Sequence, residues 1–153
     1  MDLWKDLSKG KLLGHPIHVM LVHFPIAIFP VSLIFDMIAF IKDDSLFSLL
    51  SFFLISIGTG GGYLAAFFGM VDLISLPDEK RIWKKAIIHA SLNGTILFSY
   101  TIIAALLFKN YPQITIPTLL QLILNAGLNL LLITGAYWGG DLILRHKVGV
   151  IED

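Results

Sequence analysis

The chain has 153 residues, of which 56% are hydrophobic and only 14% are charged, and its mean hydropathy is +0.82. Soluble domains carry about 25% charged residues, so this composition excludes an ordinary soluble domain and indicates a membrane protein. The formal net charge is zero, which leaves no global field to attract nucleic acid. The absence of cysteine excludes disulfides, thiolate zinc sites and iron–sulfur ligation by this chain.

Four apolar stretches are long enough to cross a bilayer, which takes about 20 helical residues. They cover residues 19–41, 46–71, 86–108 and 117–140. The first is longer than the apolar region of a signal peptide and has no small-residue cleavage site, so we interpret it as a retained membrane helix. Short connections make consecutive helices antiparallel neighbours. The sequence therefore predicts one all-α membrane domain over residues 1–153, a four-helix bundle in up-down-up-down order without an internal repeat.

Lysine and arginine are distributed unequally between the two ends of these helices, and an excess marks the cytoplasmic side. Only Lys42 and Lys109 fall on one side. The other nine fall on the opposite side: Lys5, Lys9, Lys11, Lys80, Arg81, Lys84, Lys85, Arg145 and Lys147. Both termini are therefore predicted to be cytoplasmic, in a multi-pass protein of the inner (cytoplasmic) membrane that lipid surrounds.

All five histidines map to this cytoplasmic side. His15, His18 and His23 stand at the start of the first helix, His89 near the start of the third, and His146 after the fourth. At 1.5 Å per residue, His23 and His89 lie at matching depths, roughly 6 and 5 Å into their helices. Intramembrane polar groups need partners and often mark function. The alternatives are interfacial histidines that bind water and headgroups, and histidines that only hydrogen-bond between helices.

Other polar and small residues indicate helix faces that point into the bundle. Asn93 shares a face with His89, and Asn125 and Asn129 lie one turn apart at mid-membrane, where we expect interhelical hydrogen bonds. In the second helix, small residues follow a four-three-four-three spacing that lets a neighbouring helix approach closely and directs an aspartate inward: Gly58, Gly62, Ala65, Gly69 and Asp72.

Two kinds of bound group fit these residues. Haem b needs two axial imidazoles from facing helices, which His23 and His89 would supply, with Asn93 as a hydrogen-bond partner of a ligand. A divalent metal would be held by imidazole and carboxylate groups, and the candidates for such a site are His15, His18, Asp72 and His146. The sequence has neither a serine elbow nor a cysteine nucleophile, so we do not expect a stand-alone enzyme.

The interpretation that we favour is a haem b-binding redox subunit for electron transfer. One alternative is a metal-binding or transport protein that uses the same histidines, and another is a structural or assembly subunit of a membrane complex without a cofactor. For partners we expect a homo-oligomer or a place as a subunit of a membrane complex, and the redox interpretation adds a separate electron-transfer protein.

Several motifs resemble a bacterial family of predicted membrane proteins catalogued as a domain of unknown function. They are GHPIHVMLVHFP at 14–25, FD at 35–36, GMVD at 69–72, HASLN at 89–93 and WGGDLILRHKVGV at 138–150. The resemblance covers about residues 14–150 and implies a four-helix membrane fold but no established activity. Some relatives are fused to a Rieske-type iron–sulfur domain, which implies contact with electron transfer. In this cysteine-free chain an iron–sulfur partner would be a separate polypeptide.

The resemblance also places certain residues at the family's motif positions. They are His15, His18, His23, Asp72, His89, Asn93, Asp141 and His146. Lys147 stands where relatives usually have glycine, so the turn at the tail departs from the family pattern.

Overall fold

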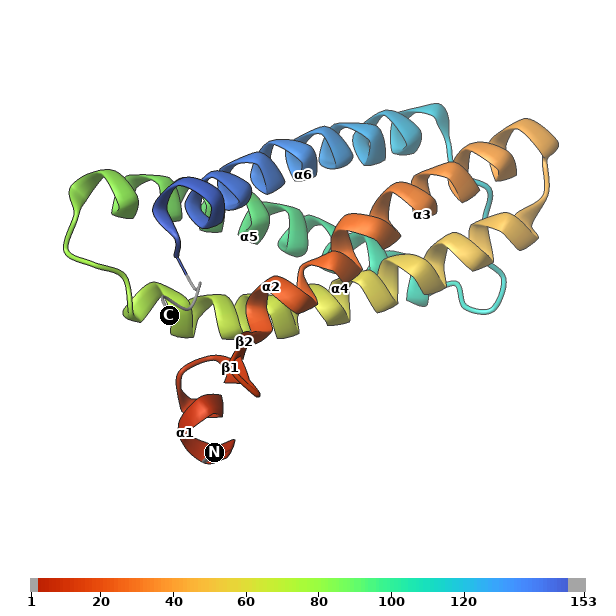
Figure 1. Cartoon of the computed structure of the whole chain (residues 1–153). Helices are drawn as coiled ribbons and strands as arrows, with labels where there is room; N and C mark the ends of the chain where they lie inside the picture. The colour runs from red at the N-terminus through yellow and green to blue at the C-terminus, as the bar shows by residue number, and fades with distance from the viewer. Residues whose placement is uncertain (1–2, 149–153) are drawn as a thin grey trace.

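The structure is a computed structural model that describes residues 3–148, so the last two residues of the closing motif, 149 and 150, lie outside the described part. Its helices are α1 (Leu3–Ser8), α2 (Ile17–Leu21), α3 (His23–Lys42), α4 (Ser45–Ile74), α5 (Lys80–Phe108) and α6 (Leu119–His146). Two short strands, β1 (Lys11–Leu12) and β2 (His15–Pro16), pair as an antiparallel hairpin. Figure 1 shows α1 and this hairpin projecting from a bundle of the longer helices.

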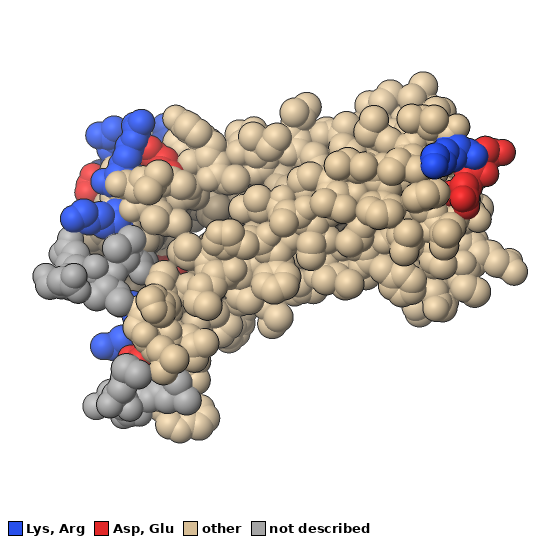
Figure 2. Space-filling model, turned by 45° about the vertical axis from the view of Figure 1, so that its right-hand side comes forward, with Lys and Arg blue, Asp and Glu red and all other residues tan. Residues whose placement is uncertain are grey.

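Four segments are long and apolar enough to cross a membrane, which confirms the predicted all-α membrane fold. They are Ile17–Lys42, Ser45–Ile74, Lys80–Phe108 and Leu119–His146, of 26 to 30 residues each. Large apolar side chains on the outside of the bundle are exposed, for example Phe98 and Ile133, both at 65% exposure. This is the pattern of residues that face lipid. Figure 2 shows charged side chains gathered at the two ends of the molecule, with an uncharged belt between them.

The first span is divided into α2 and α3 by Val22. Pro25 has no N–H to donate to the carbonyl of Leu21, so the helical hydrogen-bond ladder is interrupted at this point. Before the span, the β1–β2 turn places Leu13 and Gly14 at positive φ, 51° and 83°. Two consecutive positive φ values are the geometry of the tight turns that join antiparallel strands. The first candidate span thus begins directly after the hairpin at Ile17, two residues earlier than the predicted start at residue 19.

Local capping explains where the other long helices begin and end. Asp43 takes a left-handed conformation (φ 54°) that ends α3, and Asp44 accepts a hydrogen bond from the N–H of Leu46 to begin α4. Thr118 and Gln121 form a capping box at the start of α6. Because α6 continues to His146, the motif that follows residue 140 is helical, and its polar side chains lie on the same helix as Gly135 and Gly139.

Contacts between the long helices pair their residues in reverse order. Phe29 packs against Gly58, and the later Ser32 accepts a hydrogen bond at its carbonyl from the earlier Ser51. Likewise, Lys85 pairs with Asp141, and the later Tyr100 pairs with the earlier Asn125. The first set joins α3 to α4 and the second joins α5 to α6, so the bundle consists of two helix pairs that lie side by side (Figure 1). The side of the membrane on which the termini lie stays a prediction.

The core lies where the two helix pairs meet. Phe29 of α3 and Tyr100 of α5 are fully buried and stack with ring centres 3.9 Å apart. Around them pack Ile55, Ile96, Leu97 and Leu132. The small residues of α4 line this contact as predicted: a Cβ added at Gly58 would lie 2.8 Å from the Phe29 ring, and one at Gly62 would lie 2.3 Å from Leu97. Close approach of the helices therefore depends on these glycines.

Candidate functional site: a pair of facing histidines

His18, on the short helix α2, is held by α4. Its Nδ1 lies 2.7 Å from the carbonyl oxygen of Ala65. One turn further along α4, Gly69 makes room for the ring, since an added Cβ would lie 2.9 Å from the His18 Cε1 atom. A carbonyl only accepts, so Nδ1 carries the hydrogen and, in the neutral ring, the lone pair lies on Nε2. The backbone of α4 thereby fixes both the orientation and the tautomer of His18.

His89, on α5, is held in the same way by α6. Its Nδ1 lies 2.9 Å from the carbonyl oxygen of Gly135, and a Cβ at Gly139 would lie 2.7 Å from its Cε1 atom. Asn93, one turn along α5, donates its amide to the carbonyl of His89 at 2.8 Å and packs against Gly135. By the same reasoning the lone pair of the neutral His89 ring lies on Nε2.

The two rings face each other across the junction between the helix pairs. Their centres are 6.2 Å apart and their planes are nearly perpendicular, at 86°. Both rings are half-buried, and across the described residues no hydrogen bond to either Nε2 is present. The arrangement therefore provides two imidazoles on separate helix pairs, each anchored through Nδ1 and each with a free lone pair.

The equivalence of the two histidines extends into the sequence and corrects the expectation of no internal repeat. Ala65–Gly69 reads AAFFG and Gly135–Gly139 reads GAYWG. Each segment supplies a carbonyl that binds a histidine and, four residues later, a glycine whose missing side chain leaves room for the ring, here called the glycine notch. Eleven residues after each histidine stands one of the two stacked core rings, Phe29 or Tyr100. The bundle is thus two similar helix hairpins, and the histidine pair and the aromatic stack lie where they meet.

The structure pairs His89 with His18, whereas His23 was the partner expected from the sequence. His23 is exposed, and its Nδ1 lies 3.3 Å from the carbonyl of Met20 in its own segment. On one helix, residues five apart differ by about 140°, so His18 and His23 cannot both face inward. The helix had been expected to begin at residue 19, which placed His18 outside it. Asn93 does lie beside His89, as its shared face predicted.

The four residues proposed for a divalent metal do not form one cluster. His15 lies exposed in β2, and Asp72 lies at the end of α4 against Gly10. His146 lies near Lys85, with its Nε2 2.9 Å from the Lys85 Nζ. Within residues 3–148, no three histidine, aspartate or glutamate side chains are arranged to hold a metal ion.

An ionic cluster lies one turn from His89. Lys85 of α5 forms an ion pair with Asp141 of α6, and both side chains are largely buried, at 13% and 7% exposure. The exposed Arg145 binds the other carboxylate oxygen at 3.1 Å, and the His146 ring lies 4.0 Å from the carboxylate. This cluster fixes α5 against α6 one turn from His89. From the sequence, Lys85 was expected at the cytoplasmic end and Asp141 at a motif position, and no pairing between them was predicted.

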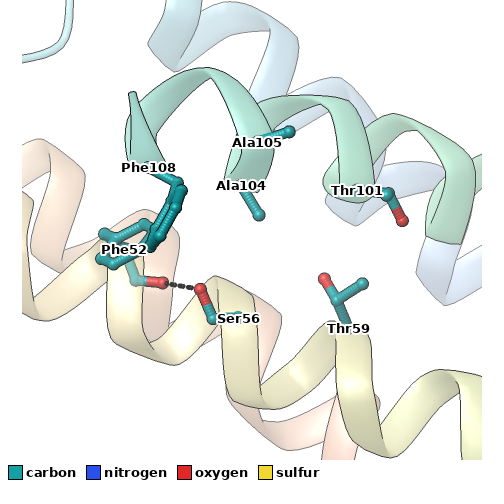
Figure 3. Close-up of a pocket in the computed structure, with 7 residues that line it drawn as sticks. All are labelled: Phe52, Ser56, Thr59, Thr101, Ala104, Ala105 and Phe108. Carbon is teal, nitrogen blue, oxygen red and sulfur yellow. Dashed lines mark hydrogen bonds between the residues drawn. The ribbon is translucent and has the colours of Figure 1, made fainter. Parts of the chain in front are cut away.

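A groove on the bundle surface lies between α4 and α5 and has a volume of about 340 Å³. Figure 3 shows Phe52 and Phe108 at one end and the hydroxyls of Ser56, Thr59 and Thr101 along its sides. Each of these hydroxyls donates to a carbonyl of its own helix, so the groove offers hydrocarbon surface and no free donor. Neither histidine lines it.

The comparisons with known proteins agree with the membrane fold. A family model described as a predicted membrane protein (DUF2231) matches residues 14–152, the same region that the sequence motifs covered. No curated protein and no solved structure matches the chain. His18, His89 and the glycines that hold their rings all fall within the matched region. The chain therefore belongs to the DUF2231 family of predicted membrane proteins of unknown function.

Proposed function

We propose that this protein binds haem b between His18 and His89 and serves as an electron-transfer subunit in the membrane. The distance between the two rings carries the proposal. A metal–imidazole bond of about 2.0 Å, added to about 1.1 Å from ring centre to nitrogen, puts two imidazoles on opposite sides of one metal ion about 6.2 Å apart. The observed separation of the ring centres is 6.2 Å.

The surroundings of each ring support a ligand role. Histidines that bind metals usually donate their second ring nitrogen to a carbonyl or carboxylate, which orients the ring and raises its basicity. Both His18 and His89 donate through Nδ1 to a backbone carbonyl of the neighbouring long helix. A ligand to a single interhelical metal would be expected from each hairpin, and each hairpin provides one.

The number of ligands favours haem over a bare divalent metal. Structural zinc sites take four protein ligands and catalytic ones three, whereas haem iron needs only its axial ligands from the protein. The described residues offer two imidazoles and no third ligand in an arrangement for a metal ion. Bound haem b would supply one-electron chemistry at this position. The chain's own part is to hold the two rings in place through the backbone carbonyls of α4 and α6.

The test is the visible absorption of the full chain, expressed with ample haem and purified in mild detergent, before and after reduction with dithionite. We expect a Soret band and sharp reduced α and β bands, which His18→Ala and His89→Ala each abolish or convert to a high-spin spectrum. His23→Ala is the matched control, because it removes an exposed histidine from the same span. A colourless protein with a folded bundle would refute haem binding. It would favour a metal site if the same sample contained stoichiometric metal, and a structural or assembly subunit otherwise.

We also propose that the histidine pair lies toward the cytoplasmic side of the inner membrane, where a separate electron-transfer protein or another subunit of a complex would meet it. The excess of lysine and arginine at that end of the bundle supports this orientation. The cysteine-free chain allows a direct test with single cysteines at Asp78 and Gln113, in the two exposed links. A membrane-impermeant maleimide added to intact cells should label Gln113→Cys only, and labelling of Asp78→Cys alone would reverse the orientation.

A further inference from the structure

The helix α1 and the β1–β2 hairpin form a small unit beside the bundle, here called the projection. Gly10, between α1 and β1, is buried against the end of α4, where an added Cβ would lie 3.1 Å from Asp72 Oδ1 and 3.5 Å from Val71 Cγ1. The Gly10 carbonyl also accepts a hydrogen bond from the N–H of Ile17 at 2.8 Å. Figures 1 and 2 show that the rest of the projection extends sideways, across the direction of the long helices. Its base is therefore fixed to the bundle while its outer part extends away from it.

The start of the first span places the projection at the level of the lipid headgroups. The span Ile17–Lys42 has 26 residues and is therefore about 39 Å long at 1.5 Å per residue. A bilayer is about 30 Å thick in its hydrocarbon core and about 40–45 Å thick with its headgroup regions, so Ile17 lies among the headgroups. The hairpin ends at the residue before Ile17. Because the projection runs across the long helices, it stays in this layer and extends over the lipid beside the bundle (Figure 1).

Large apolar side chains of the projection are exposed. Trp4 on α1 is 81% exposed, and Leu13 and Leu12 at the tip of the hairpin are 59% and 39% exposed. Exposed apolar groups gathered in a small unit mark a surface that contacts a partner or a membrane. Tryptophan is the side chain enriched at membrane interfaces, because its ring is apolar and its indole N–H still needs a polar partner. The exposed apolar side chains therefore suit the boundary between headgroups and hydrocarbon.

Basic side chains accompany the apolar ones. Lys9 is exposed and Lys11 is half-buried, and together they outnumber the carboxylate of Asp6. Figure 2 shows the charged atoms of the projection on the same side as the charged end of the bundle, away from the uncharged belt. Lysine can lay its stem along apolar surface while its ammonium group reaches a phosphate. Each lysine near an anionic membrane surface strengthens binding by about fivefold, so the charge of the projection favours anionic headgroups.

We propose that the projection is a surface anchor that binds the anionic headgroup layer of the membrane beside the bundle. Trp4, Leu12 and Leu13 enter the layer, and Lys9 and Lys11 pair with headgroup phosphates. The occupant is lipid because the projection extends sideways from the start of a membrane span and combines exposed apolar groups with positive charge, as segments that lie in the interface do. The two histidines take no part in the anchor, so this inference does not depend on haem binding.

The experiment uses Trp4 as a fluorescent reporter in the full chain. Trp83→Phe combined with Trp138→Phe leaves Trp4 as the only tryptophan. The protein is placed in nanodiscs of phosphatidylcholine and phosphatidylglycerol, with the same composition in both leaflets, so the result does not depend on the side that the termini face. We expect quenching by lipids brominated near the headgroup end of the acyl chain, and less quenching by acrylamide than for N-acetyltryptophanamide in water. Full access to acrylamide without quenching by brominated lipid would place the projection in water and overturn the proposal.

If the variant with two phenylalanines does not fold, the difference in quenching between wild type and Trp4→Phe gives the same measurement. A further substitution tests the tip of the hairpin. Leu13→Asn preserves the turn, because asparagine adopts the positive φ of 51° more readily than leucine, but it removes an exposed apolar side chain. Quenching of Trp4 by acrylamide should therefore increase. Unchanged quenching would show that the tip does not enter the lipid and would contradict the anchor.

The role of the lysines is tested by the identity of the brominated lipid. At equal content, brominated phosphatidylglycerol should quench Trp4 more strongly than brominated phosphatidylcholine. Lys9→Gln combined with Lys11→Gln should abolish this preference. Lys109→Gln is the matched control and should retain it, because it removes an exposed lysine at the opposite end of the bundle. Equal quenching by the two lipids in the unsubstituted projection, or a preference that survives the loss of both lysines, would overturn the assignment of anionic headgroups.

Discussion

Replacing Gly139 by alanine tests whether the notch in α6 holds the His89 ring. The new Cβ would lie 2.7 Å from Cε1 and 3.0 Å from Nδ1, whereas ordinary contacts begin at 3.4 Å. The ring cannot move away from α6 without stretching its 2.9 Å hydrogen bond to Gly135. Overpacking of this kind costs about 1–3 kcal/mol, which corresponds to about a 5- to 150-fold loss in the folding equilibrium constant.

The neighbouring Gly140 provides the control, because a Cβ there would meet nothing within 4 Å. Both substitutions lie inside α6, so the gain in helix propensity is the same for each and cancels in the comparison. Unfolding of both variants by sodium dodecyl sulfate in mixed micelles, followed by circular dichroism, measures the difference. We expect Gly139→Ala to unfold at lower denaturant than Gly140→Ala. Equal midpoints would refute the claim that the notch holds the ring.

Three other substitutions test separate parts of the structure. His23→Ala should leave the midpoint of unfolding within about 0.5 kcal/mol of wild type, because its side chain is exposed, and a larger loss would assign it a packing role. Gly62→Ala should lower the free energy of unfolding by about 1–3 kcal/mol, because its Cβ would lie 2.3 Å from Leu97. The double variant with Leu97→Ala should lose less stability than the sum of the two single losses, and additive losses would contradict the contact. Tyr100→Phe should cost about 0.6–1.7 kcal/mol by removing the hydroxyl between the two asparagines, measured in the same titration, and a neutral result would show that these hydrogen bonds contribute nothing to stability.

The sequence was sufficient to predict the membrane fold because hydropathy acts over whole helices. It also predicted that Asn125 and Asn129 form hydrogen bonds between helices, because polar side chains at mid-membrane need partners within the protein. The structure places His18, and not the expected His23, opposite His89, and the reason is local. A start two residues earlier and an interruption at Val22 decide whether His18 or His23 faces inward, and such boundaries depend on a single proline and a turn.

The repeat between the two hairpins was missed because few of its residues are identical. AAFFG and GAYWG share only two letters, and what they have in common is a carbonyl and a notch that hold an imidazole. Every residue has a backbone carbonyl, so the sequence does not show which carbonyl binds a histidine. The repeat could have been found only from its spacing: a histidine, an aromatic residue eleven positions later, and a segment with small residues on the next helix. The hydrogen bond that Asn125 of α6 donates to Asp36 of α3 was equally hidden, because it depends on how these two helices lie against each other.

A bundle of two similar hairpins has the form that results when two copies of one hairpin are fused into a single chain. In a symmetric dimer, a residue on the two-fold axis meets its own copy, and both partners must change together. A single chain that contains both hairpins is free of that constraint. His18 and His89 are equivalent in the two hairpins, whereas the equivalent positions Ile55 and Asn125, seventy residues apart, carry an apolar and a polar side chain. The chain is therefore symmetric at the end that holds the imidazoles and free to be asymmetric at the end that holds Asp36.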